Sequence, residues 1–84
     1  MVHVCILTIS QKESPDLFQQ VINTCDFCVN KDKTFTYETQ PGGEGIKIFC
    51  PLGKNQAYRR GSYFHKKHGI NYEVMWEKNA QTNT

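Results

Sequence analysis

The sequence predicts an α+β domain of the ferredoxin-like βαββαβ class, with a four-stranded antiparallel sheet and two helices on one face. Three observations lead to this prediction: an apolar opening run, two amphipathic helical segments, and two alternating segments typical of edge strands. In this arrangement the first and third strands are central, and right-handed crossovers carry both helices to the same face. The alternative fold is a ββαβ unit with the first strand and helix docked differently.

The first half of the chain predicts a central strand followed by a helix. Residues 2–9 are β-branched and apolar on both faces, as expected of a central strand. Ser14, Pro15 and Asp16 form a helix start, with a hydroxyl cap, a first-turn proline and an acid near the positive end of the dipole. The apolar stripe of this helix consists of Leu17, Phe18, Val21, Ile22, Cys25, Cys28 and Val29. We expect the helix to end near Asn30.

The second half predicts two edge-type strands around another strand and helix. Residues 34–39 alternate between polar and apolar side chains, as half-buried edge strands do. A connector rich in glycine leads to a third strand over 46–50, which stops before a proline. The second helix covers residues 55–68 and ends at Gly69, whose freedom at positive φ suits that position. An alternating strand over 72–77 completes the sheet.

The chain has 84 residues, which we interpret as a single domain over residues 1–78 followed by a flexible tail over 79–84. Hydrophobic residues make up 38% of the chain and charged residues 21%, a composition typical of folded globular proteins. No apolar run is long enough to span a membrane, and the first residues lack the pattern of a signal peptide. We therefore expect a soluble, cytoplasmic protein whose four cysteines are reduced thiols.

Positive charge is concentrated in the second half of the chain, although the formal net charge is only +2. Residues 1–42 hold three lysines against five acids, a balance of −2. Residues 43–84 hold seven Lys and Arg against three acids, a balance of +4. Between Lys54 and His68 there are five cations, two histidines and no acid. This asymmetry indicates that the second helix carries a basic surface.

The predicted second helix separates a buried face from a basic one. The buried face holds Ala57, Gly61, Phe64 and His68. The opposite face holds Arg59, Arg60, Tyr63, Lys66 and Lys67, with Asn55, Gln56 and Ser62 around them. Ordinary surface helices mix charges and gain from ion pairs along the helix, which a face without acids cannot do. We interpret this face as a partner-binding surface that also includes Phe27, which projects away from the apolar stripe of the first helix; a merely solvated face is the alternative.

Two kinds of partner suit this surface. The first is a protein with an acidic or polar surface, or a nucleoprotein complex, which arginines would grip and an aromatic ring would anchor. The second is nucleic acid, bound by the basic helix or by a sheet face that presents Lys47, Phe49 and Lys54. The third strand lacks the aromatic-rich motif of RNA-recognition domains, so a protein partner is favoured. Pairing of two copies through an edge strand stays open, with Trp76 serving as a core or a dimer contact.

The sequence contains no pattern that indicates catalysis. Cys25 and Cys28 form a C-x-x-C pair, but they lie in the last turn of the first helix, where the dipole disfavours a thiolate. A zinc site is a weak alternative, with Cys25 and Cys28 facing His65 and His68 across two neighbouring helices. The sequence shows no paired carboxylates, no serine triad and no phosphate-binding loop. We therefore predict a non-enzymatic binding protein without a cofactor or a bound metal.

The segment 57–76 reads Ala-Tyr-Arg-Arg-Gly-Ser-Tyr-Phe-His-Lys-Lys-His-Gly-Ile-Asn-Tyr-Glu-Val-Met-Trp. It resembles the closing helix-and-strand unit of some small phage-encoded accessory proteins. The resemblance covers about a quarter of the chain and brings no individual functional residue with it. It implies a host-directed or defence-directed inhibitor that works stoichiometrically in the cytoplasm of a host cell. On this basis we expect an inhibitor or modulator of a protein machine rather than an adaptor.

Overall fold

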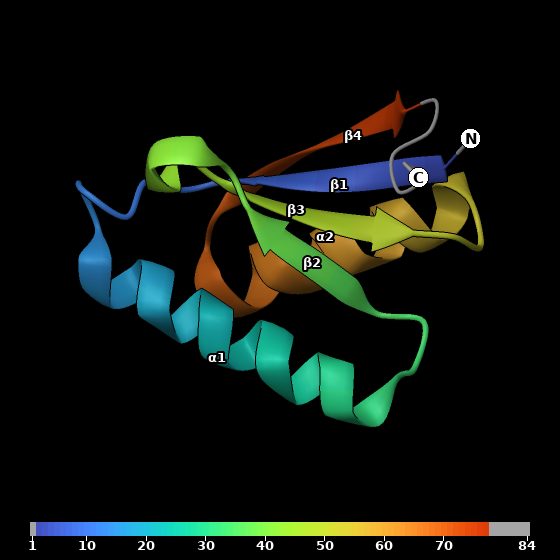
Figure 1. Ribbon diagram of the computed structural model, residues 1–84, viewed down its shortest axis with the longest axis horizontal. Coiled ribbons are helices and arrows are strands. Elements are labelled where there is room, and N and C mark those ends of the chain that lie inside the picture. Colours follow the sequence, from blue (N-terminus) through green and yellow to red (C-terminus); the bar gives the residue numbers. More distant parts are fainter. Residues whose placement is uncertain (1, 78–84) are drawn as a thin grey trace.

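Residues 2–77 are described by a computed structural model, in which one sheet packs against two helices (Figure 1). The elements are β1 (Val2–Thr8), α1 (Pro15–Lys31), β2 (Thr36–Thr39), the short 3-10 helix η1 (Pro41–Gly43), β3 (Ile46–Cys50), α2 (Lys54–His68) and β4 (Asn71–Glu77). Each predicted strand and helix agrees with these bounds to within two residues. The predicted tail over 79–84 lies outside the described residues. Within the described part, no helix is both long enough and apolar enough to cross a membrane.

The strand order in the sheet is β2-β3-β1-β4, and every neighbouring pair is antiparallel. The first and third strands are therefore central and the second and fourth form the edges, which confirms the predicted ferredoxin-like α+β arrangement. α1 connects two parallel strands that flank β3, and α2 connects two parallel strands that flank β1. Right-handed crossovers of this kind bring both helices to one face of the sheet.

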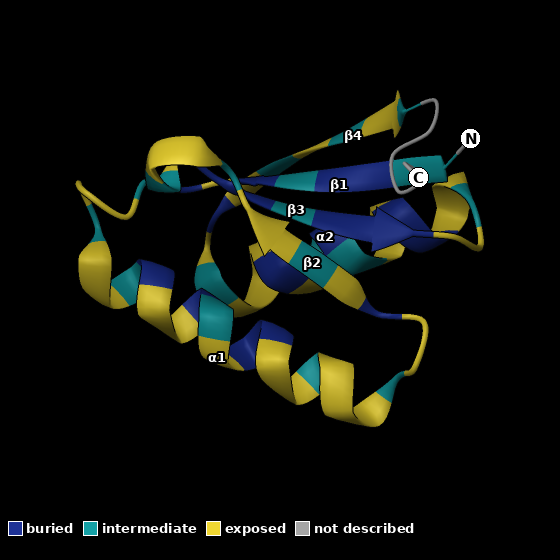
Figure 2. Ribbon diagram, viewed as in Figure 1, coloured by how far each residue is buried: buried dark blue, intermediate teal, exposed yellow. Residues whose placement is uncertain are grey.

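Alternation along the central strands sends one row of side chains toward the helices. Cys5 pairs with Ile48 and Leu7 pairs with Ile46, and all four side chains are fully buried. The helices complete this core with Phe18, Val21, Cys25, Ala57 and Phe64. Figure 2 shows the resulting pattern, with buried residues along the middle of β1 and β3 and at regular intervals along α1. The hydrophobic pattern of the sequence therefore accounts for the layer structure.

The close packing of α2 on the sheet depends on Gly61. A Cβ atom added to Gly61 would lie 2.1 Å from Cδ2 of Tyr72 on β4, far inside van der Waals contact. Tyr58, one turn earlier on the helix, packs edge-on against the same ring, with centroids 6.5 Å apart. A glycine inside a helix costs stability relative to alanine, and here that cost is offset because the helix can approach the Tyr72 ring directly.

Two local features differ from the expectations of the sequence. Ser14 makes no side-chain capping bond within the described residues. Its backbone N–H donates instead to the Ser10 carbonyl at 2.9 Å, and its carbonyl accepts from the Phe18 N–H at 2.8 Å. Gln56, expected on the exposed side of α2, is buried because its Oε1 accepts a hydrogen bond from the Leu52 N–H at 3.0 Å. At Ser14 the backbone makes the hydrogen bonds, whereas at Gln56 the side chain bonds back to the turn before the helix.

We expect Gly61→Ala to lower the free energy of unfolding by about 2 kcal/mol, even though alanine is the better helix former. The added methyl group would have to displace the Tyr72 ring. Chemical denaturation of the wild type and the variant measures the difference. Ser62→Ala, at the next position of the same helix, is the control and should change the free energy of unfolding by less than about 0.5 kcal/mol. A Gly61→Ala variant as stable as the wild type would contradict the packing described here.

Candidate functional site

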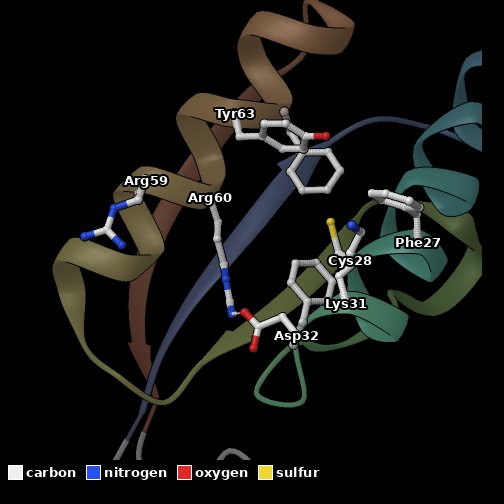
Figure 3. A pocket seen from close by; sticks show the side chains of 9 residues that line it. Phe27, Cys28, Lys31, Asp32, Arg59, Arg60 and Tyr63 are labelled. Atoms are coloured by element: carbon white, nitrogen blue, oxygen red, sulfur yellow. Dashed lines mark hydrogen bonds and ion pairs between the residues drawn. The ribbon is translucent and has the colours of Figure 1, made fainter.

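A groove of about 370 Å³ lies between the C-terminal half of α1 and the middle of α2 (Figure 3). Its lining residues are Phe27, Cys28, Lys31, Asp32, Phe35, Arg59, Arg60, Tyr63 and Phe64. Four of these nine side chains are aromatic, so rings form much of the surface of the groove. The groove brings together four of the six predicted partner-binding residues, which the chain separates into two distant segments. Lys66 and Lys67 do not line it.

Two of the aromatic rings in the groove are exposed. Phe27 on α1 exposes 57% of its surface and Tyr63 on α2 exposes 44%, so each helix contributes one ring. Tyr63 packs edge-on against the fully buried Phe64, with centroids 5.3 Å apart. Lys31 follows Phe27 by one helical turn, and its Nζ lies 5.3 Å from the centroid of the Phe27 ring. The structure thus confirms that Phe27 is exposed, and it adds a cation beside the ring.

A second hollow of about 300 Å³ continues the groove along the two helices. Its lining residues are Asn23, Thr24, Phe27, Tyr63 and Lys67. Because Phe27 and Tyr63 line both hollows, we treat the two as one feature and call it the interhelical surface. Lys31 belongs to one hollow and Lys67 to the other, so both parts of the interhelical surface carry a cation.

Arg60 was predicted to lie on the exposed basic face, and that prediction is wrong. Its side chain is only 10% exposed. It donates hydrogen bonds to the Asp32 carboxylate at 2.9 Å, to the Phe49 carbonyl at 2.9 Å and to the Thr34 hydroxyl at 3.1 Å. These acceptors belong to β3 and to the connection after α1. Arg60 therefore holds three segments together and is not free to bind a partner.

The neighbouring arginine behaves differently, although the two residues are adjacent in the same helix. Figure 3 shows Arg60 extending from α2 to Asp32, whereas the guanidinium of Arg59 points away from the groove. The guanidinium carbon of Arg60 also lies 4.7 Å from the centroid of the Phe35 ring, a cation–π contact that helps to fix it. Of the two, only Arg59 remains an exposed cation.

Asp32 is held as an anion by the groups around it. Its Oδ1 accepts hydrogen bonds from the Thr34 hydroxyl at 2.7 Å and from the Thr34 N–H at 2.9 Å, and its Oδ2 accepts one from Arg60. These bonds, with the Thr34 hydroxyl contributing most, lower the pKa of the Asp32 carboxyl below its usual value. Asp32 is the one acid among the groove residues, and its charge is balanced by Arg60.

The remaining cations of the predicted surface are exposed. Arg59, Lys66 and Lys67 lie on the solvent side of α2, as expected. Over residues 2–77, none of the three forms an ion pair. Since α2 contains no acid, these charges repel one another and gain nothing from the helix itself. An acidic partner would remove this unfavourable interaction.

The alternative nucleic-acid face does not have the predicted geometry. Phe49 is buried and cannot stack on a base. Lys47 is bound to Glu77, with Nζ and Oε2 2.8 Å apart, and lies 5.9 Å from the Phe49 ring. Lys54 is exposed at the start of α2 but has no exposed ring from this set beside it. Lys47 and Phe49 are therefore corrected from candidate binding residues to structural ones.

The four alternative zinc ligands do not form a cluster. His65 Nδ1 lies 2.9 Å from the Ile70 carbonyl, and His68 Nε2 lies 3.0 Å from the Thr24 hydroxyl. Cys25 is buried in the core, while Cys28 is half-buried at the groove. Among residues 2–77, no three potential ligands of the His, Cys, Asp and Glu types come close enough to hold a metal ion. The imidazoles have local structural partners instead.

The C-x-x-C pair has the properties of packed thiols. Burial raises the pKa of Cys25 to about 12, and burial also raises the pKa of Cys28. A thiol of this kind is protonated at neutral pH and is a poor nucleophile. All four cysteines are free. Cys28, the one thiol that lines the groove, is therefore not an activated nucleophile.

Three residues that line the groove were not predicted from the sequence: Lys31, Asp32 and Phe35. Lys31 follows Phe27 by four positions, which places both on the same face of a helix, so this contact was open to prediction. Phe35 lies just before β2 and is buried. Its contact with Arg60 joins residues 25 positions apart and leaves no local signal in the sequence.

Comparisons with protein-family models, with curated proteins and with solved structures found no match to this chain. The resemblance of residues 57–76 to phage-encoded accessory proteins therefore remains an expectation. The geometry of the interhelical surface is therefore the basis for proposing a function.

The two adjacent arginines form a matched pair for a stability test. We expect Arg60→Ala to lower the free energy of unfolding by about 1–2 kcal/mol, because it leaves the Phe49 carbonyl without its charged donor and removes the contact with the Phe35 ring. Arg59→Ala should change it by less than about 0.5 kcal/mol, since Arg59 is exposed and unpaired. Denaturation with urea measures both variants. Equal effects at the two positions would contradict the structural role of Arg60.

The bonds to Asp32 predict a particular pH dependence. Because the pKa of Asp32 is lowered in the folded state, its contribution to stability is present above the ordinary pKa of 3.8 and is lost as the pH falls through the lowered value. We expect the wild type to be more stable than Asp32→Asn at neutral pH. The difference should decrease below about pH 5 and approach its minimum at the acid limit. Thermal unfolding of both proteins across this pH range measures it, and a difference that grows on acidification would contradict the assignment.

Proposed function

We propose that this protein is a small non-enzymatic binding protein that inhibits or modulates another protein, or a nucleoprotein complex, through the interhelical surface. The observation that carries the proposal is the pair of exposed rings, Phe27 and Tyr63, on either side of a hollow with unpaired cations around it. The site of action in this proposal is the cytoplasm, and that of a host cell if the phage resemblance of residues 57–76 holds.

The exposed rings support a protein partner because they provide anchors for binding. Fully burying an aromatic side chain contributes about 1.5–3 kcal/mol. Binding energy at protein interfaces is concentrated in a few such residues, which are surrounded by polar groups that exclude water. Phe27 and Tyr63 have this setting, since Lys31 and Lys67 line the same hollows.

The fixed wall of the groove also supports binding. Arg60 is held by several hydrogen bonds and Phe64 is fully buried, so neither side chain loses much freedom when a partner docks. Preformed surfaces of this kind bind more tightly because less entropy is lost on association.

The charges favour an acidic or polar partner. Arg59, Lys66 and Lys67 make no ion pairs within residues 2–77, and the one acid of the groove is already bound to Arg60. Carboxylates on a partner would therefore meet cations that have no competing internal acid. Complementary charge of this kind raises the association rate and suppresses wrong partners. The partner we propose is a protein segment with an apolar side chain for the hollow and acids around it.

Nucleic acid is the alternative partner, because α2 has no acid and two exposed rings could stack on bases. The net charge of +2 and the burial of Phe49 favour a protein instead. Solubility alone would explain a basic helix face. It would not explain an exposed aromatic ring on each side of a hollow.

Two pairs of matched variants test the proposal. The immobilised wild type first captures binding proteins from a cell extract treated with nuclease, and the purified partner is then titrated by calorimetry. We expect Phe27→Ala to weaken binding by about 1–2 kcal/mol. Its control, Leu52→Ala, removes an apolar side chain that is even more exposed but lies away from the interhelical surface, and should have no effect.

The charge pair is Lys67→Glu and Lys12→Glu. Both reversals change the net charge equally, but Lys67 lines the interhelical surface and Lys12 does not. We expect only the former to weaken binding, and the loss should shrink at high salt. Titration with single-stranded RNA, single-stranded DNA and duplex DNA completes the test. Salt-sensitive binding to nucleic acid that is lost in Lys67→Glu, with no protein captured, would replace the proposed function by the alternative.

A further inference from the structure

The outer edge of β4 has no partner strand. β4 pairs with β1 through seven consecutive residue pairs, from Asn71 opposite Thr8 to Glu77 opposite Val2, without a bulge. In the part of the chain that the structure describes, no strand lies on the other side of β4. Alternate residues of such an edge direct their N–H and C=O groups away from the sheet, where another chain can accept and donate hydrogen bonds.

Apart from its two glutamates, β4 lacks the features that usually prevent edge strands from pairing. Its sequence contains no proline and no lysine. Two large apolar side chains are exposed at its end, with Met75 44% and Trp76 63% exposed. The opposite edge differs, because β2 is only four residues long and is followed directly by the turn that contains Pro41. Of the two edges, β4 is therefore the one suited to pairing.

A second copy of β4 complements this edge in an antiparallel register centred on Val74. Tyr72, Val74 and Trp76 share the face that carries the helices, because their partners on β1 are Leu7, Cys5 and His3. When the two Val74 residues lie opposite each other, Tyr72 of one copy faces Trp76 of the other. On the opposite face, Glu73 then faces Met75. Aromatic pairs across strands stabilise a sheet, and in this register no acid faces an acid.

Charge excludes the adjacent registers. Sliding one copy by two residues in one direction places the two Glu73 side chains opposite each other. Sliding it in the other direction places Glu73 opposite Glu77. Like charges directly opposite destabilise a strand pair. A shift by one residue would place residues whose N–H and C=O groups point away from the sheet opposite residues whose groups point back toward β1. The two strands could then form no ladder of hydrogen bonds.

We propose that the protein forms a symmetric homodimer in which two β4 strands pair antiparallel about Val74 and join the two sheets into one. The interface is isologous, so it closes on two copies and does not continue into a fibre. Tyr58, which is exposed and packs against Tyr72, stands beside the same edge and adds apolar surface to it. This proposal depends on a different surface from the proposed function and stands apart from it.

The first test is the mass of the full chain in solution. Sedimentation equilibrium over a wide concentration range should give a dimer that dissociates on dilution. Trp76→Arg should raise the dissociation constant by about tenfold or more, because the substitution occurs twice in a symmetric interface. Leu52→Arg changes an apolar residue outside β4 that is even more exposed than Trp76, and should leave the dissociation constant unchanged. Circular dichroism of each variant verifies that the monomer is folded.

The second test uses introduced cysteines to determine which residues of the two β4 strands lie opposite each other. In a Cys28→Ser background the remaining native cysteines are buried. Glu73→Cys and Met75→Cys chains are then treated with a bifunctional thiol reagent about 5 Å long, which spans residues that are directly opposite but not diagonal ones. In the proposed register a mixture of the two chains cross-links rapidly, while the Met75→Cys chain alone, which keeps Glu73 and Glu77, cross-links slowly.

Three results would overturn the proposal. A monomer at every concentration would show that the edge does not pair with a second copy. A dimer that survives Trp76→Arg would place the interface elsewhere. Faster cross-linking of the Met75→Cys chain alone than of the mixture would assign a register that places Glu73 opposite Glu77.

Discussion

The bonds of Arg60 are the interaction on which the candidate site depends. This side chain extends from α2 to the Asp32 carboxylate and the Phe49 carbonyl, and so connects α2 with β3 and with the connection after α1. A cation that would otherwise add to the basic face is placed in the wall of the groove instead. Together with the contact between Thr24 of α1 and His68 of α2, these bonds hold the end of α1 beside α2 and so maintain the groove between the two helices.

The orientation of α2 about its own axis is fixed by two adjacent residues. Gly61 lets the helix lie directly on the Tyr72 ring, and Arg60 holds the side of the helix that faces α1. Together they prevent the helix from rolling. Tyr63 is consequently directed beside the groove, and Lys67, one turn further along, lines the adjoining hollow. The packing of α2 thus determines which of its side chains a partner can reach.

The fold could be predicted from the sequence because its signals are local: alternation in the strands, periodicity in the helices, and Gly69 after α2. The exposure of Phe27 followed from the same periodicity. The role of Arg60 did not, because Arg59 and Arg60 are the same residue type in the same helix and differ only in what lies opposite them. That partner, Asp32, is 28 residues away along the chain. The burial of Phe49 likewise depends on packing between elements. The alternation of side chains within a single strand does not predict it.

The interhelical surface and the β4 edge share no residue, so a dimer formed through β4 leaves both interhelical surfaces open. Residues that face each other across an antiparallel pair lie on the same side of the sheet. Both pairs of helices would therefore project from one side of the joined sheet. A target that presents two acidic sites on one face would then bind both copies, and the second contact would form at high effective concentration. The weak attraction of a few surface cations is sufficient for a tight complex under those conditions, because two modest contacts dissociate together far more rarely than one.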